Sequence, residues 1–448
     1  MAGPSLLRGT VMHVPRDPFR EDGALEAFDD GALVLEGGEV LAAGDYAALR
    51  RRYPQAAVDD RRGAVVLPGL IDAHVHYPQV PAIGAVGMRL LTWLERHTLP
   101  EEARYGDAGY AAARADIFLR LLAASGTTTA LVFGAHFASA MEAFFRAAER
   151  SGLRITAGLS VADRNLRQEL HTTPERALAE GLELALRWHG RGRLRYAVTP
   201  RFALSAGEGL LEACGELLRA VPGVLFTTHL NESAEEIRAV SELFPWAADY
   251  LATYERFGLL TQRSLFAHDV HPRAGELERL AAADATVVHC PTSNVSLGSG
   301  LFPLRRHLRA GVRVALGSDV GAGTGFGVLK EALAAHQVQM LRDDGEMLDP
   351  ARLLYLATGA GARALGLGGV VGDFQPGRQA DLLVLRPPPG STLAQVLATA
   401  DDAETALAAI VTLAGEASVE EVRVGGTPVH GGPPRERTGL DAGPGGGP

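Results

Sequence analysis

The chain has 448 residues, of which 47% are hydrophobic and 21% charged, and its formal net charge is -10. This length exceeds that of a small domain, and the apolar content allows a large buried core. An acidic chain without a basic stripe is not typical of a nucleic-acid-binding protein. No apolar run is long enough to span a membrane, and the first residues lack the apolar segment of a signal peptide. We therefore expect a cytoplasmic protein without nucleic-acid or membrane partners.

Cysteine and lysine are scarce, and their scarcity excludes certain sites. The two cysteines, Cys214 and Cys290, lie far apart, so neither a disulfide framework nor a Cys-x-x-Cys metal site is indicated. The sole lysine is Lys330, which excludes any mechanism that needs a lysine earlier in the chain.

Both ends of the chain have the short apolar runs and Gly breaks of β-structure. Residues 1–66 contain GALVLEGGEVLAAG and the start of AVVLPG, which runs from residue 64 to residue 69, and residues 376–430 contain ADLLVLRP and EVRVGGTPV. We expect these segments to be the N-terminal and C-terminal parts of one small flanking β domain, a sheet or a sandwich. Residues 431–448 are rich in Gly and Pro and are expected to be a flexible tail.

Residues 67–375 alternate apolar strands with amphipathic helical segments such as 137–150 and 274–283. The expected strands are 65–76, 127–133, 153–161, 194–202, 224–230, 264–270, 286–291 and 314–320. Strands separated by helices indicate parallel β/α units, and eight of them fit a TIM-like (β/α)8 barrel. We therefore predict an α/β fold, a (β/α)8 barrel with a small flanking β-sandwich built from both chain ends. A doubly wound open sheet is the alternative, which the missing Gly-x-Gly-x-x-Gly turn weakens.

A His-x-His pair ends the first expected strand, in LPGLIDAHVH. His74 and His76 project to the same side of a strand and can bind one metal ion. Catalytic groups of a barrel lie at the C-terminal ends of its strands. The other strand ends carry Arg201 with Phe202, His229, His268 and Asp319. Three imidazoles and one carboxylate, from His74, His76, His229 and Asp319, form a set typical of a catalytic zinc site.

Two further residues near these ligands suit acid–base chemistry. Glu232 follows His229 by three residues in THLNES and is expected on a loop facing the site, where a carboxylate can transfer protons. His268 is a candidate for orienting a water molecule or stabilising a tetrahedral intermediate. Asp319 would also fit a helix cap, but its position at the last strand end favours a ligand that also holds the water. His289 is expected to be a packing residue.

Segments along nearly the whole chain resemble the amidohydrolase superfamily, namely PGLIDAHVH, the strand-end His and Asp, and PGRQADLLVL. Within it, the chain resembles the guanine deaminase family in HVHYPQ, LLTWLERHTLPEEARYGD, SGTTTALVFG, TPRFALS, HLNES, HCPTSNVSLGSGLF and GSDVGAGTGF. The resemblance implies a (β/α)8 barrel with a flanking β domain, one zinc ion per chain and a homodimer. It also implies hydrolysis of guanine to xanthine and ammonia, a step of purine catabolism.

The resemblance also assigns roles to individual residues. The implied zinc ligands are His74, His76, His229 and Asp319, with Glu232 as the proton shuttle and His268 assisting at the metal-bound water. The implied substrate contacts are Gln79, Arg201 and Phe202, together with His229, Glu232 and His268. Arg201 can donate to the guanine carbonyl, and Gln79 can donate and accept along the ring edge. Phe202 offers an apolar surface, although adjacent strand residues face opposite sides unless the strand has ended.

The residues indicate a single metal ion but leave other substrates open. In the hydantoinase-like and urease-like amidohydrolases a carboxylated lysine on the fourth strand bridges two metals. Here that strand, LRYAVTPRF, has neither a lysine nor a glutamate that could replace it. Deamination of a related ring, such as 8-oxoguanine, isocytosine, a pterin or a triazine, stays an alternative. A non-catalytic metal-binding scaffold is a further one.

Overall fold

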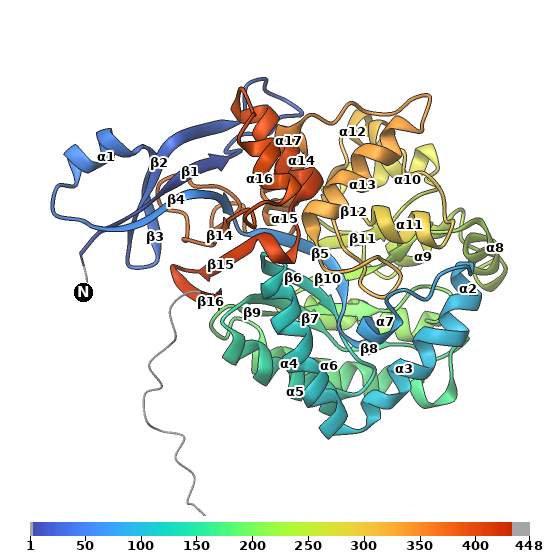
Figure 1. Ribbon diagram of the computed structural model, residues 1–448. Helices are drawn as coiled ribbons and strands as arrows, with labels where there is room; N and C mark the ends of the chain where they lie inside the picture. Colours follow the sequence, from blue (N-terminus) through green and yellow to red (C-terminus); the bar gives the residue numbers. More distant parts are fainter. Residues whose placement is uncertain (1–2, 432–448) are drawn as a thin grey trace, which may run out of the picture.

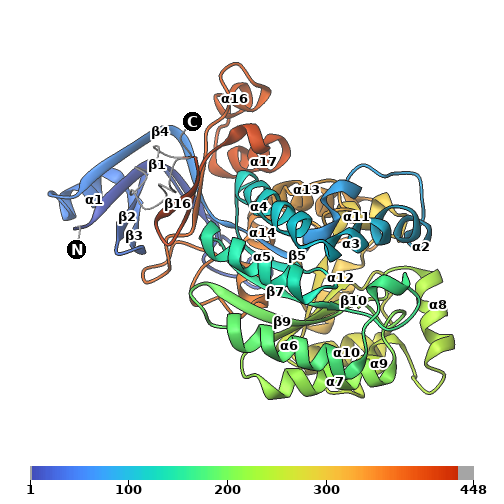
Figure 2. The same cartoon turned by 90° about the horizontal axis from the view of Figure 1, so that it is seen from below.

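The computed structural model describes residues 3–431, so the tail expected at 431–448 lies, apart from residue 431, outside the described residues. Within residues 3–431 the strands form two sheets, which lie side by side (Figure 1 and Figure 2). One is wrapped by helices, and the other contains both ends of the described chain. None of the described helices combines the length and the apolar character that a membrane crossing requires.

The first sheet is a parallel barrel that confirms the predicted (β/α)8 architecture. Its hydrogen-bonded order is β13-β12-β11-β10-β9-β7-β6-β5, and the short β8, which pairs with β9, continues β7. The backbone N–H of Asp319 donates to the carbonyl of His74 at 2.9 Å, which joins the last strand to the first. The barrel strands are β5 (Leu70–His76), β6 (Thr127–Phe133), β7 (Arg154–Gly158), β8 (Ser160–Val161), β9 (Leu194–Pro200), β10 (Leu225–Leu230), β11 (Ser264–His268), β12 (Thr286–His289) and β13 (Arg313–Leu316).

The barrel strands are buried on both faces, which explains their continuous apolar sequences. Every residue of β5 and β6 is buried. Small and branched side chains from seven strands form one apolar cluster, whose strand members are Ile71, Ala73, Leu131, Ala197, Leu225, Leu265, Val288 and Ala315. Helix α15 (Gly359–Ala364) adds Ala362 and Ala364 to this cluster. The barrel interior is therefore a packed core, and the polar strand ends lie beyond it.

Amphipathic helices follow the strands and cover the barrel, as the alternating pattern predicts. The predicted helices 137–150 and 274–283 correspond to α5 (Ala138–Ser151) and α10 (Ala274–Ala282). The other helices around the barrel are α4 (Ala108–Ala124), α6 (Pro174–Trp188), α7 (Glu208–Ala220), α8 (Ala234–Leu243), α9 (Tyr250–Glu255), α11 (Pro291–Ser296), α12 (Leu304–Ala310), α13 (Val328–Met340) and α14 (Pro350–Ala357), with the 3-10 turn η4 (Gln168–Leu170).

The segment between β5 and α4 contains only short helices and matters for the site. Its elements are the 3-10 turn η1 (Tyr77–Ala82), α2 (Leu90–Trp93), the π-helical turn η2 (Leu94–Thr98), α3 (Leu99–Ala103) and the 3-10 turn η3 (Arg104–Gly106). Leu90, Trp93, Leu94 and Leu99 pack in one apolar cluster with Phe202, which follows β9. The segment therefore lies over the C-terminal ends of the barrel strands.

The second sheet is built from both ends of the chain, as expected, and is a single sheet within residues 3–431, with the order β16-β15-β14-β4-β1-β2-β3. Its strands are β1 (Ser5–His13), β2 (Glu26–Glu36), β3 (Glu39–Asp45), β4 (Ala57–Pro68), β14 (Leu382–Leu385), β15 (Val419–Val424) and β16 (Thr427–Gly431). The C-terminal part also contains helices, which the expected β pattern omits. These are α16 (Thr392–Leu397) and α17 (Ala403–Leu413), with the turn η5 (Glu416–Ser418), whereas α1 (Tyr46–Arg52) follows β3.

The prediction of one continuous strand over residues 65–76 is wrong at Gly69. Residues up to Pro68 belong to β4 of the flanking sheet, and the barrel strand β5 starts at Leu70. A Cβ atom at Gly69 would lie 2.3 Å from the Thr128 side chain, so only glycine fits where the chain passes between the two sheets. The division of the chain at residues 66 and 375 stays a prediction.

An ion pair whose Arg154 side chain is 11% exposed and whose Asp381 side chain is 1% exposed joins the two sheets and allows a stability prediction. The Arg154 guanidinium at the start of β7 donates to Asp381, which precedes β14, at 2.6 and 3.1 Å. Asp381→Asn leaves Arg154 without its counter-ion, so we expect the free energy of unfolding to fall by about 3 kcal/mol, measured by urea denaturation. Asp30→Asn breaks an exposed pair with Arg8 and is the matched control, with little expected change. Equal effects of the two substitutions would contradict the argument.

Candidate metal centre and active-site pocket

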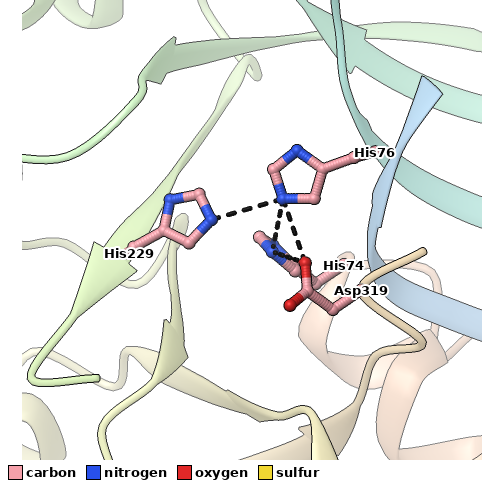
Figure 3. Close-up of side chains that lie close together, drawn as sticks. All are labelled: His74, His76, His229 and Asp319. Atoms are coloured by element: carbon pink, nitrogen blue, oxygen red, sulfur yellow. Dashed lines mark hydrogen bonds and ion pairs between the residues drawn. The ribbon is translucent and has the colours of Figure 1, made fainter. Parts of the chain in front are cut away.

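The four predicted metal ligands meet at the C-terminal ends of the barrel strands. His74 and His76 lie on β5, His229 lies on β10, and Asp319 follows β13. The Nε2 atoms of His74 and His76 are 3.1 Å apart, and those of His76 and His229 are 3.3 Å apart. Asp319 Oδ1 lies 3.3 Å from His74 Nε2 and 3.1 Å from His76 Nε2. Figure 3 shows the four side chains pointing toward one another.

This spacing and chemistry fit a metal ion. Tetrahedral ligand atoms at about 2.0–2.1 Å from zinc lie about 3.3 Å from one another. Burial lowers the pKa of His74 to about 4 and that of His229 well below its usual range, so both imidazoles are neutral, which is the form that binds metals. His229 Nδ1 lies 2.6 Å from the Arg201 carbonyl and donates to it, which leaves Nε2 with a free lone pair.

A buried carboxylate, Asp72, connects the first barrel strand to the segment that follows the last barrel strand, next to the ligands. Its Oδ1 accepts from the backbone N–H of Ser318 at 3.0 Å and from that of His74 at 3.2 Å, and its Oδ2 accepts from the Ser318 hydroxyl. Asp72 therefore ties the ligand-bearing strand β5 to the residue that precedes Asp319. Asp72 lies in the motif PGLIDAHVH, but its partner Ser318 is 246 residues away, so the sequence pattern alone does not reveal this role.

Strained backbone is concentrated at the same strand ends. Among residues 3–431 six non-glycine residues have positive φ, and four of them are Asn231, His268, Asp269 and Asp319, with φ of 48°, 75°, 43° and 47°. Such conformations are uncommon for residues with a Cβ and are maintained where surrounding contacts hold them. Asp269 accepts from Asn231 Nδ2 at 2.9 Å and lies 2.8 Å from His307 Nε2, so a buried polar network fixes this corner.

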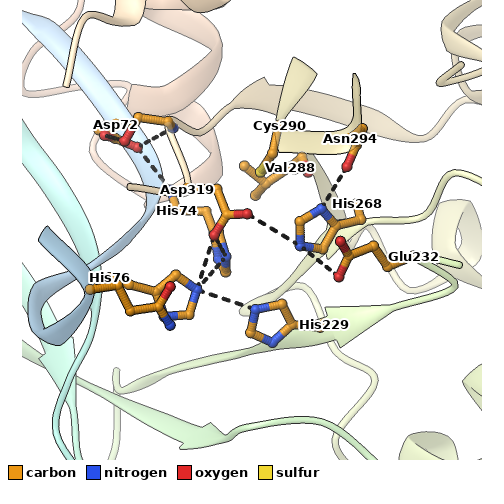
Figure 4. A network of polar contacts seen from close by, with 12 residues as sticks. Asp72, His74, His76, His229, Glu232, His268, Val288, Cys290, Asn294 and Asp319 are labelled. Carbon is orange, nitrogen blue, oxygen red and sulfur yellow. Dashed lines mark hydrogen bonds and ion pairs between the residues drawn. The ribbon is translucent and has the colours of Figure 1, made fainter. Parts of the chain in front are cut away.

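Glu232 and His268 lie next to the ligand cluster, as predicted. Glu232 Oε2 is 3.5 Å from His268 Nε2, and this nitrogen is 4.0 Å from Asp319 Oδ2 (Figure 4). Asn294 Oδ1 lies 2.9 Å from His268 Nδ1, and the Ser299 hydroxyl donates to Glu232 Oε1 at 3.2 Å. Burial raises the pKa of Glu232 to about 7, which suits a group that both takes up and releases protons.

A second group of donor atoms includes a cysteine. His74, His268 and Cys290 also lie close enough together to share an ion (Figure 4). Burial raises the pKa of the Cys290 thiol well above its usual range, however, and only the thiolate is a good metal ligand. The three-histidine and aspartate group is therefore the better metal site.

A pocket with a mostly buried lining opens onto the ligand cluster and contains the three predicted substrate contacts. It is lined by His76, Gln79, Leu90, Trp93, Leu94, Arg201, Phe202, His229, Glu232, His268, Leu297, Asp319 and Ala322. Strand β9 ends at Pro200, so Arg201 and Phe202 lie outside the strand and their side chains need not point to opposite faces. Both side chains line the pocket. The polar groups lie near the ligands, and leucines, a tryptophan and a phenylalanine supply apolar walls suited to a flat ring.

Glu102 on α3 is a further residue of this region, and no sequence motif predicts its role. Arg201 Nη1 donates to both of its carboxylate oxygens, at 2.7 and 2.8 Å, and Gln79 Nε2 donates to Oε1 at 2.9 Å. Burial raises the pKa of Glu102, but the charge of Arg201 outweighs it, and the pKa lies well below its usual range. Glu102 occurs in LLTWLERHTLPEEARYGD, where no residue pattern marks it.

Comparison with known proteins agrees with this architecture. A family model described as the amidohydrolase family matches residues 65–429, and a model of an imidazolonepropionase-like composite domain of bacteria matches residues 31–56. A probable guanine deaminase of Deinococcus radiodurans is 58% identical over 427 residues, which cover 94% of this chain and 97% of the relative. Guanine deaminase of Escherichia coli is 39% identical over 85% of this chain and 87% of its own length.

Comparison with solved structures also finds guanine deaminases. The E. coli guanine deaminase structure superposes with a TM-score of 0.91 at 35% identity and covers 97% of this chain and 100% of that one. A guanine deaminase from C. acetobutylicum, solved with guanine bound in the active site, has a TM-score of 0.88 at 25% identity, with 96% and 100% coverage. This chain therefore belongs to the amidohydrolase family and, within it, to the guanine deaminases.

Proposed function

We propose that this protein catalyses the hydrolytic deamination of guanine to xanthine and ammonia. The observation that carries the proposal is one pocket lined by His76, His229 and Asp319 of the donor set, by the Glu232 carboxylate and by the Arg201 guanidinium. The likeness to guanine deaminases, including one solved with guanine bound, supports the same substrate.

We assign one zinc ion per chain to His74, His76, His229 and Asp319. Imidazole and carboxylate donor atoms within 4.8 Å of one another suit zinc. When bound, zinc acts as a Lewis acid that lowers the pKa of water to about 7. Lys330 lies on α13, where its Nζ donates to the Thr324 carbonyl at 3.3 Å, so it is not available to bridge a second ion at β9.

We assign Glu232 to proton transfer. It takes a proton from water as the oxygen bonds to the ring carbon that carries the amine, and it passes this proton to the adjacent ring nitrogen. A second proton then moves through Glu232 from the new hydroxyl to the amine. The carbon–amine bond breaks, ammonia leaves, and a carbonyl remains on the ring. His268, 3.5 Å from Glu232, and Asp319 hydrogen-bond the attacking oxygen during these steps.

The remaining pocket residues bind and orient the ring. Arg201 donates to the guanine carbonyl, and Gln79 pairs with the ring edge. Phe202 and Trp93 supply apolar surface for the flat ring. Gln79 and Arg201 are 2% and 3% exposed, so their polar contacts to the ring are little screened by solvent.

Three further properties follow from the family resemblance and stay predictions. They are assembly as a homodimer, a cytoplasmic location and a place in purine catabolism. The contacts described above involve a single chain and do not depend on any of them.

A substrate panel tests the proposed activity. The zinc-loaded protein is expected to convert guanine to xanthine and ammonia with a higher kcat/KM than 8-oxoguanine, isocytosine, a pterin or a triazine. We expect this preference because Arg201 can donate to the guanine carbonyl and the apolar walls of the pocket suit a flat ring. Xanthine is measured by its absorbance and ammonia by a coupled assay. Preference for another ring would overturn the substrate assignment, and no turnover of any ring would favour a non-catalytic scaffold.

Replacement of Glu232 tests the mechanism. Glu232→Gln removes the group that transfers protons but none of the proposed metal ligands, so we expect kcat to fall by about 100- to 10,000-fold. The bound metal, measured by elemental analysis, should not change. Glu235→Gln alters an exposed carboxylate three residues away and should be as active as the wild type. A fully active Glu232→Gln variant would remove Glu232 from the mechanism.

Metal content tests the donor set. Elemental analysis of the purified protein should give one zinc ion per chain, and two ions would contradict the mononuclear assignment. Zinc added to chelator-treated protein should raise the melting temperature, because a ligand at 100 times its Kd stabilises the folded state by about 2.7 kcal/mol. Asp319→Asn weakens the set and should reduce this increase. An equal increase in this variant would place the zinc elsewhere.

A further inference from the structure

Glu102 contacts the substrate pocket without being one of the proposed metal ligands. It lies on the short helix α3, is 1% exposed, and has polar contacts with three side chains from three other segments. Two are the hydrogen bonds from Arg201 and Gln79, and the third is His136, whose Nε2 lies 3.3 Å from Glu102 Oε2. Arg201 and Gln79 line the pocket, and their side chains are buried with it.

The contact with Glu102 fixes which way the Gln79 amide points. An ionised carboxylate only accepts hydrogen bonds, so the amide nitrogen of Gln79 must face Glu102 and the amide oxygen must turn away from it. Within residues 3–431 this oxygen accepts no hydrogen bond from another residue. Gln79 therefore presents an acceptor to a ligand in the pocket.

The contact with Glu102 fixes the Arg201 guanidinium in the same way. Both carboxylate oxygens are engaged by Arg201 Nη1, and Arg201 Nε and Nη2 donate to no other residue of the described chain. Glu102 also supplies the counter-ion that a cation with 3% exposure requires. Arg201 therefore presents donors to the pocket next to the acceptor of Gln79.

We propose that Glu102 is a positioning residue that sets substrate specificity by holding Arg201 as a donor and Gln79 as an acceptor. This pair matches a ring that carries a carbonyl oxygen and ring N–H groups, as guanine does, and the inference rests on the proposed function. A ring without the carbonyl leaves the Arg201 donors unpaired, and a buried polar group without its partner is strongly unfavourable.

The neighbouring residue Glu101 provides the matched control. It lies on the same helix and is also buried, but its carboxylate accepts from Arg104 Nη1 at 2.8 Å and from the Tyr110 hydroxyl, and neither of these lines the pocket. A general effect of removing a buried carboxylate from α3 would therefore appear in Glu101→Gln as well. An effect on substrate choice should appear only in the Glu102 variant.

The test compares guanine with 2-aminopurine in the zinc-loaded enzyme. 2-Aminopurine has the same amine but lacks both the carbonyl and the N–H beside it. In Glu102→Gln we expect kcat/KM for guanine to fall by about 100-fold or more, mainly through KM. The reason is that Arg201 and Gln79 lose the charged carboxylate that orients them toward guanine. Competition against guanine gives the KM or Ki of 2-aminopurine whether or not it is turned over. We expect that constant to change by less than about 5-fold, since Arg201 and Gln79 bind 2-aminopurine weakly in either enzyme.

Further variants separate a specificity role from a structural one. Glu102→Asp keeps the negative charge and is the variant to use if Glu102→Gln does not fold. It should show a smaller loss of the preference for guanine over 2-aminopurine. Glu101→Gln should leave the ratio of guanine to 2-aminopurine unchanged. Metal content and melting temperature are measured for every variant. An equal loss for both substrates, or an unchanged ratio in both Glu102 variants, would overturn the inference. Failure of the wild-type enzyme to deaminate guanine would instead overturn the proposed function on which the inference rests.

Discussion

The site depends on the contact that closes the barrel, where the N–H of Asp319 donates to the carbonyl of His74 at 2.9 Å. These two residues are 245 positions apart, and this bond brings the ligands of the first and last strands together. Asp72 reinforces the closure by accepting from the backbone N–H groups of His74 and Ser318. A barrel that opened at this point would separate Asp319 from the histidines. The fold and the metal site are therefore held by the same few bonds.

Three buried carboxylates around the pocket differ in pKa because their neighbouring groups differ. Glu102 lies against the Arg201 guanidinium, and Asp319 lies among imidazole nitrogens, so the pKa of each is held well below its usual range. Glu232 has a hydroxyl and an imidazole as its polar neighbours, and burial raises its pKa to about 7. Only Glu232 is thus suited to exchange protons near neutral pH, while the other two remain charged. The proposed roles in proton transfer and in substrate recognition thus fall to two glutamates, Glu232 and Glu102, in different surroundings.

The sequence predicted the barrel and the ligand cluster because both follow from local patterns. Apolar runs define the strands, and polar residues at their ends, such as His74 and Asp319, must meet on one face of a barrel. Gly69 was missed as a strand break because the apolar run continues on both sides of it. Helix α17 was missed because strand patterns flank it, although Asp402 caps it as for any helix. Glu102 could not be predicted, since its partners are 23 and 99 residues away and only the folded chain shows them.

Arg201 connects the proposed substrate pocket to the proposed metal centre, because its backbone carbonyl and its guanidinium contact different groups. Its carbonyl accepts from His229 Nδ1 at 2.6 Å and so orients a metal ligand, whereas its guanidinium pairs with Glu102 and faces the pocket. A movement of the side chain that shifts the backbone would also turn the His229 ring. The hydrogen bonds from Arg201 to Glu102 would therefore also restrain the proposed metal ligand His229. In this arrangement the proposed substrate contact Arg201 and the proposed metal ligand His229 are linked directly through the Arg201 backbone.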